Sequence, residues 1–176
     1  MPETRFSDYL SFLQGFCASG APYFLEGGQA VNFWAEYFNA RGAGESLQRF
    51  QMLERSLVIQ GIRVIDPTFL LQSKCHCLLG LDQTDRQDEK HLRMLCVLVP
   101  AHLNGLLDEA IAGHLTQRAL INELKLLKKV LKTNRVRRSL KRIGSNPDDL
   151  VPVGKLTQSG LTKVVHFAET AYLTKE

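Results

Sequence analysis

The feature that most constrains the fold is a short apolar run followed directly by a glycine pair and a helical pattern. Residues 23–25 suit a buried strand, Gly27 and Gly28 come next, and residues 29–38 repeat apolar side chains at helical spacing. Glycine tolerates positive φ and lets the backbone approach a ligand closely. The N-terminus of a helix behind such a turn offers free N–H groups to phosphate. The pattern predicts strand, turn and helix, with Gly27, Gly28 and Gln29 as candidate phosphate contacts.

A second ordered stretch begins at residue 62. Residues 62–65 are rich in β-branched side chains, which favours a strand. Asp66 suits the N-cap of a following helix over residues 68–79, because Pro67 is favoured at the first helical position. Thr84 and Gln87 have the spacing of a capping box, which predicts that the next helix starts near Thr84. That helix continues through residue 99, and Pro100 is expected to kink or restart it.

Both stretches resemble a known family. The string Leu-Glu-Gly-Gly-Gln-Ala-Val-Asn-Phe-Trp-Ala-Glu occupies residues 25–36, and residues 62–74, 78–81 and 85–96 form the second matching set. Together they resemble the nucleotidyltransferase superfamily, in particular one of its bacterial branches. The resemblance implies an α+β fold and transfer of a nucleoside monophosphate from a nucleoside triphosphate. It also implies that Gly27 and Gly28 hold phosphate and that Mg²⁺ binds on an Asp-x-Asp pair in the following strand.

The sequence departs from this family at the metal site. Residues 39–60 contain no Asp, and their only carboxylates, Glu45 and Glu54, do not form the expected pair. Magnesium requires oxygen ligands, usually with at least one or two carboxylates, so we expect no metal site. The two matching stretches also lie closer together than in the family, which suggests that the central part of the sheet is missing. We therefore expect impaired catalysis, with Mg²⁺ and nucleoside triphosphate as cofactors only if the activity is retained.

The helical second half carries an unusual run of positive charge. Residues 125–142 contain nine Lys or Arg and no carboxylate, while leucines recur every three or four residues from Leu120 to Leu131. Such a run is either a solvated helix face or a surface for nucleic-acid phosphate or an acidic protein. It contains no aromatic residue, so base stacking of the usual kind is not supported there. The candidate nucleic-acid contacts are Lys125, Lys128, Lys129, Lys132, Arg135, Arg137 and Arg138.

The remaining features exclude several other classes. The five histidines are scattered, and Cys75-His76-Cys77 lacks the spacing of a zinc module, so we read these thiols as core residues of a reduced protein. No signal peptide and no run of membrane-span length is evident, which predicts a cytoplasmic protein with no membrane partner. The strand at residues 62–65 either pairs with residues 23–25 or keeps an open edge. Because open edges invite association, we expect dimers or oligomers.

Composition bounds the overall organisation. The chain has 176 residues, 44% hydrophobic content and a formal net charge of +4, which suit one compact domain. We expect an α+β fold, with a small nucleotidyltransferase-like sheet remnant packed by helices over residues 1–105. A helical C-terminal region over residues 106–176 belongs to the same unit and ends in one helix over residues 156–173. The leading function is a nucleotidyltransferase-like protein. The alternatives are a non-catalytic nucleic-acid- or protein-binding module and an internally deleted relic.

Overall fold

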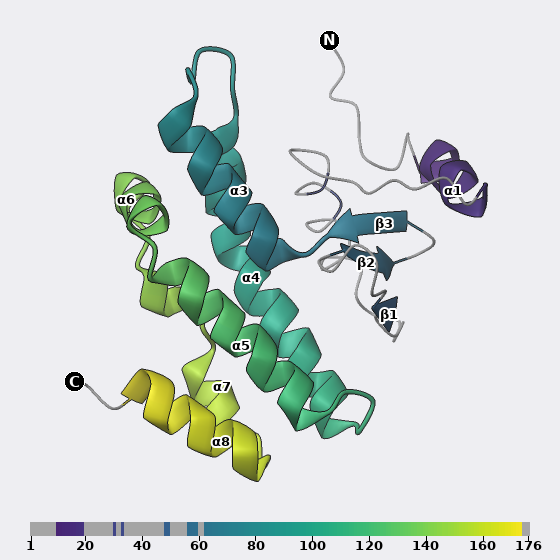
Figure 1. Ribbon diagram of the computed structural model, residues 1–176, viewed down its shortest axis with the longest axis vertical. Helices are drawn as coiled ribbons and strands as arrows, with labels where there is room; N and C mark the ends of the chain where they lie inside the picture. Colours follow the sequence, from purple (N-terminus) through teal and green to yellow (C-terminus); the bar gives the residue numbers. More distant parts are fainter. Residues whose placement is uncertain are drawn as a thin grey trace. The chain divides into compact units, whose positions relative to one another are not determined.

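The computed structural model describes residues 10–19, 30, 33, 48–49, 56–59 and 62–173, and it divides into two compact units. Unit 1 extends to Leu95 and unit 2 begins at Cys96, so the division falls inside helix α4 (Asp88–Ile111). The described residues are mostly helical with a small antiparallel sheet, which confirms the α+β class in this coarse form (Figure 1).

Unit 1 contains the sheet. Strands β1 (Gln48–Arg49), β2 (Ser56–Ile59) and β3 (Ile62–Ile65) lie in the order β1-β2-β3, with both pairings antiparallel. Leu57 faces Val64 and Ile59 faces Ile62, and all four side chains are buried. The alternation of strand side chains therefore places one face of the hairpin in the core. The strand expected at residues 62–65 is confirmed and pairs with β2, whereas residues 23–25 lie outside the described residues.

The chain leaves the sheet through a well-defined helix cap. Helix α3 (Pro67–Gly80) follows β3 directly, and the Asp66 carboxylate accepts hydrogen bonds from the backbone N–H of Thr68 at 2.6 Å and of Phe69 at 3.4 Å. These contacts satisfy donors that the first helical turn leaves without intrahelical partners. The predicted cap at Asp66, with Pro67 at the first helical position, is confirmed.

The predicted capping box at Thr84 is wrong. Thr84 lies in a turn, where its N–H and hydroxyl both donate to the Asp82 carboxylate, and helix α4 begins four residues later at Asp88. The buried Asp88 carboxylate instead accepts hydrogen bonds from Arg86 and, at 2.7 Å, from the buried ammonium of Lys74 on α3. A long-range ion pair therefore fixes this helix start, where the sequence suggested a local cap.

Helix α4 runs without interruption through Pro100 to Ile111, so the expected kink does not divide it. By length and composition it is sufficient to cross a membrane, and half of the relevant window is buried within the protein. Core helices of water-soluble proteins are also long, apolar and largely buried, so length and composition alone do not identify a membrane span. It does show that the expectation of no run of span length was too strict.

Unit 2 continues with two amphipathic helices. Helix α5 (Gln117–Leu131) is capped by the Thr116 hydroxyl and buries the leucine stripe that the sequence predicted: Leu120, Leu124, Leu127 and Leu131. Helix α6 (Asn134–Arg142) follows after a short break and buries Val136 and Leu140. The two helices are separated at Lys132 and Thr133, so the basic run is divided between α5 and α6.

The last part of unit 2 is more divided than expected. A 3-10 turn, η2 (Pro147–Leu150), precedes helix α7 (Val153–Thr157), helix α8 (Thr162–Ala168) and a π-helical turn, η3 (Glu169–Leu173). Gly160 has φ of 72°, and the chain changes direction between α7 and α8 (Figure 1). The prediction of one helix over residues 156–173 is therefore wrong, because the segment around Gly160 adopts a backbone conformation that a helix does not contain.

Candidate anion-binding site

The two sets of candidate site residues have different outcomes. Gly27, Gly28 and Gln29 lie outside the described residues. Among the residues that the structure does describe, no three His, Cys, Asp or Glu side chains gather as a metal would require. Asp66 serves as a helix cap. In the triplet Cys75-His76-Cys77, Cys75 is fully buried, His76 is exposed and Cys77 is partly exposed. The described candidates for function are thus the cations of unit 2.

Three lysines of the basic run form a row along the solvent side of α5. Lys125, Lys129 and Lys132 are exposed and follow one another at spacings of four and three, opposite the buried leucine stripe. The row spans about 10 Å along the helix axis at 1.5 Å per residue. The Lys125 ammonium also lies 5.9 Å from the centre of the Phe167 ring on α8. The row presents positive charge to solvent over two helical turns.

Helix α6 continues the positive surface on two flanks. Arg137 and Lys141 share one flank at a spacing of four, while Arg135, Arg138 and Arg142 share the other, and all five are exposed. No described carboxylate forms an ion pair with Arg137, Arg138 or Lys141. Between Cys96 and Leu173 the chain carries twelve Lys or Arg against six Asp or Glu. The positive charge of the protein is therefore concentrated in unit 2.

Lys128 is an exception among the seven predicted nucleic-acid contacts. Its ammonium donates a hydrogen bond to the backbone carbonyl of Ala171 at 2.7 Å and lies 5.4 Å from the centre of the Tyr172 ring. The side chain is only partly exposed. Lys128 therefore joins η3 to α5, and its ammonium is engaged within the fold.

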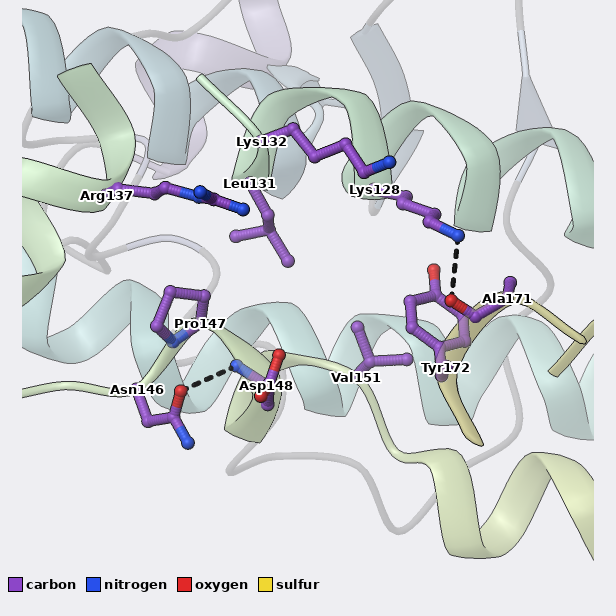
Figure 2. A pocket seen from close by; sticks show the side chains of 10 residues that line it. All are labelled: Lys128, Leu131, Lys132, Arg137, Asn146, Pro147, Asp148, Val151, Ala171 and Tyr172. Carbon is purple, nitrogen blue, oxygen red and sulfur yellow. Dashed lines mark hydrogen bonds between the residues drawn. The ribbon is translucent and has the colours of Figure 1, made fainter. Parts of the chain in front are cut away.

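A pocket of about 380 Å³ opens beside these cations within unit 2 (Figure 2). Three cations line it, Lys128, Lys132 and Arg137, and the Arg137 side chain extends toward the interior of the pocket. Two polar residues also line the pocket: Asn146, the N-cap residue of η2, and Asp148 within η2. The other lining residues are Leu131, Pro147, Val151, Ala171 and Tyr172.

The electrostatic balance of the pocket favours an anion. The described carboxylates make no ion pair with Lys132 or Arg137, although Asp148 lines the same pocket. The Lys128 ammonium is already held by Ala171. Lys132 and Arg137 therefore keep their donors available at the rim, where a guanidinium and an ammonium together suit a phosphate or carboxylate.

Tyr172 closes one side of the pocket. Its hydroxyl donates to the backbone carbonyl of Leu124 at 3.0 Å, and its ring packs edge-on against Phe167 with a centre-to-centre distance of 6.1 Å. Burial raises the pKa of the Tyr172 phenol to about 12. The phenol is therefore a fixed neutral donor that shapes the pocket wall.

Sequence reasoning identified the cations of this site but not its other half. Residues 146–151 and 171–172 are far from the basic run in sequence, and no local pattern connects them with it.

No protein-family description matches this chain, no curated protein matches it, and no solved structure matches it.

Proposed function

We propose that this protein is a non-catalytic nucleic-acid-binding module that holds the phosphate backbone against the exposed cations of α5 and α6. The observation that carries this proposal is the row of Lys125, Lys129 and Lys132, continued by exposed arginines on α6. No described carboxylate forms an ion pair with Lys129, Lys132 or Arg138. Phosphate contacts by such side chains supply sequence-independent affinity through release of counterions.

The chemistry of the surface favours backbone contact over base recognition. The exposed side of α5 and α6 presents long cationic side chains, and the nearest aromatic residues, Phe167 and Tyr172, are engaged with Lys125 and Lys128. Stacking of unpaired bases on this surface therefore has no free aromatic platform among these residues. A duplex, which offers phosphates but no exposed base faces, is the ligand that fits such a surface.

A salt series with a charge-matched control tests the proposal. Filter binding to an RNA duplex and to a DNA duplex should give a linear fall of log affinity with log salt. The variant Lys129→Gln/Arg138→Gln/Lys141→Gln removes three exposed cations of this surface, and the slope should decrease by about one unit per lost contact. The control Lys90→Gln/Lys155→Gln/Lys163→Gln removes the same charge from exposed positions outside the basic run.

The control decides whether the surface or the net charge is responsible. Equal loss of binding in both variants would reduce the effect to overall charge and would refute the proposed surface. Absence of salt-dependent binding by the unaltered protein at low ionic strength would show that the basic run is only a solvated face. Circular dichroism melting of both variants checks that the fold is retained.

We further propose that unit 1 descends from the nucleotidyltransferase superfamily and that the transfer chemistry is lost. The support is the resemblance at residues 25–36 and 62–96, together with a strand and capped helix at Ile62–Ile65 and Pro67–Gly80. In this view the glycine pair is inherited, whereas the metal-binding carboxylates are not. A cytoplasmic location and self-association through a strand edge belong to the same proposal, and light scattering at high protein concentration tests the association.

A further inference from the structure

We propose that the pocket of unit 2 is a binding site for a phosphate monoester carried on a polar ring, the chemistry of a nucleoside monophosphate. The pocket shares Lys132 and Arg137 with the backbone-binding surface. Its ligand nevertheless occupies the pocket itself, so it is tested separately from binding of the nucleic-acid backbone. The proposal rests on the size of the pocket, on the two cations at its rim and on the groups of the facing wall.

The size of the pocket sets the class of ligand. At about 380 Å³ it lies at the lower end of the range for small-molecule sites, which is roughly 300–1,000 Å³. An inorganic phosphate would leave most of this space to water. A phosphate that carries a sugar and a base would fill it.

The rim cations select the phosphate. Lys132 is the C-cap residue of α5, and Arg137 lies in the second turn of α6. The short break between the two helices therefore brings an ammonium and a guanidinium to the same pocket. Figure 2 shows the Arg137 side chain extending into the pocket, while Lys128 is directed to Ala171. A terminal phosphate carries nearly two negative charges at neutral pH and offers three acceptor oxygens, so it can engage both cations at once.

The facing wall selects what the phosphate carries. Asn146 and Asp148 supply oxygen acceptors, although the Asn146 side-chain oxygen already accepts from the Asp148 N–H at 3.2 Å. The Asp148 carboxylate makes no ion pair with a described cation and is available for a hydroxyl or amino donor. Pro147 and Val151 add apolar surface next to it. Sugar hydroxyls and the flat face of a base match these groups, whereas a purely anionic ligand meets repulsion from Asp148.

This ligand chemistry has two natural sources, a free mononucleotide and the 5′-phosphate end of a nucleic-acid strand. Both present the same monoester joined to ribose. They differ in that the strand end brings additional phosphates to the neighbouring basic surface. The experiment therefore includes both.

Calorimetry with adenosine 5′-monophosphate is the central measurement, with adenosine and inorganic phosphate as partial ligands. Arg137→Gln should weaken binding of the monophosphate about tenfold or more, because it removes a charged donor. The matched control Arg138→Gln loses the same charge at the adjacent exposed position but does not line the pocket, and it should change the affinity less than about twofold. Asp148→Asn should lower the preference for the monophosphate over inorganic phosphate, because repulsion of bare phosphate is relieved.

The outcomes separate the two sources. Preference for a 5′-phosphorylated oligonucleotide over both its 5′-hydroxyl form and the free monophosphate assigns the strand end, and equal or tighter binding of the free monophosphate assigns the mononucleotide. The proposal is overturned if neither phosphorylated ligand binds, or if Arg137→Gln and Arg138→Gln weaken binding equally. The triple variant of Lys129, Arg138 and Lys141 leaves the pocket lining intact, so failure of the backbone-binding surface can be distinguished from failure of the pocket.

Discussion

The Lys128 ammonium donates a hydrogen bond to the Ala171 carbonyl at 2.7 Å, although the two residues lie 43 positions apart in the chain. The same ammonium lies over the Tyr172 ring. A lysine that belongs to a basic run by sequence therefore holds the end of unit 2 against α5. Its neighbour Lys129, one position away, is exposed and lies on the open side of the helix.

This difference predicts unequal effects on stability for two adjacent lysines. Lys128→Gln should lower the free energy of unfolding by about 1–2 kcal/mol, because it removes a charged hydrogen bond and a cation–π contact from a partly buried site. Lys129→Gln should change it by less than about 0.5 kcal/mol. Urea denaturation followed by circular dichroism measures both. Equal effects would show that the contact with Ala171 does not contribute.

A second prediction concerns Tyr172 at alkaline pH. Its pKa in the folded protein is about 12, above the ordinary value of 10, so the unfolded chain loses this proton first. Between pH 10 and 12 the unfolded state therefore binds fewer protons than the folded state, and stability should fall as pH rises through this window. Tyr172→Phe should remove that part of the pH dependence while costing the hydrogen bond to Leu124. Thermal melts of both proteins between pH 9 and about pH 12, the pKa of Tyr172, measure this difference in pH dependence.

A third prediction concerns the Asp88 carboxylate. Burial by itself raises its pKa, but hydrogen bonds from Arg86 and Lys74, together with their charges, lower it overall below the ordinary value. Asp88 therefore contributes stability that is present above the pKa of the unfolded chain, near 4, and is lost as pH falls through the lower folded value. Asp88→Asn should flatten the acid limb of the stability curve.

Removal of one partner from this ion pair should be more harmful than removal of both. Asp88→Asn leaves the buried ammonium of Lys74 without its carboxylate, and we expect a loss of about 3–5 kcal/mol. Lys74→Met/Asp88→Asn should lose less, because no buried charge is left uncompensated. A double variant less stable than Asp88→Asn would contradict this account.

The last prediction concerns magnesium and nucleoside triphosphate. Because residues 39–60 contain no Asp-x-Asp pair, we expect the chain to bind ATP or GTP weakly or not at all, and without dependence on Mg²⁺. Calorimetry with each nucleotide, with and without Mg²⁺, tests this expectation. Tight binding that requires the metal would restore the nucleotidyltransferase reading of the site.

Local sequence patterns predicted the local features of the fold. Asp66 and Pro67 specify a helix start through the hydrogen bonds and dihedral angles of a few neighbouring atoms, and the structure confirms it. The leucine stripe of α5 is likewise set by helical periodicity, so its burial could be predicted. Whether the glycine pair at Gly27 and Gly28 holds phosphate stays a prediction.

Features that depend on distant residues could not be predicted. The helix start at Asp88 depends on Lys74, which lies fourteen positions earlier, and a plausible local cap at Thr84 concealed it. The pocket forms only where η2 and η3 lie next to α5 and α6, and no residue spacing in the sequence predicts that these segments are neighbours. For the same reason Lys128 looked equivalent to Lys129, because only the folded chain brings Ala171 to one of them.

The burial of Cys75 on α3 allows the local opening of unit 1 to be measured by thiol labelling. This thiol is fully shielded in the folded chain, so a thiol-labelling reagent can reach it only after the helix leaves the core. The rate at which Cys75 acquires the label, followed by peptide mass spectrometry, therefore reports how often this part of the protein opens. The partly exposed Cys96 offers an internal standard for reagent access in unit 2.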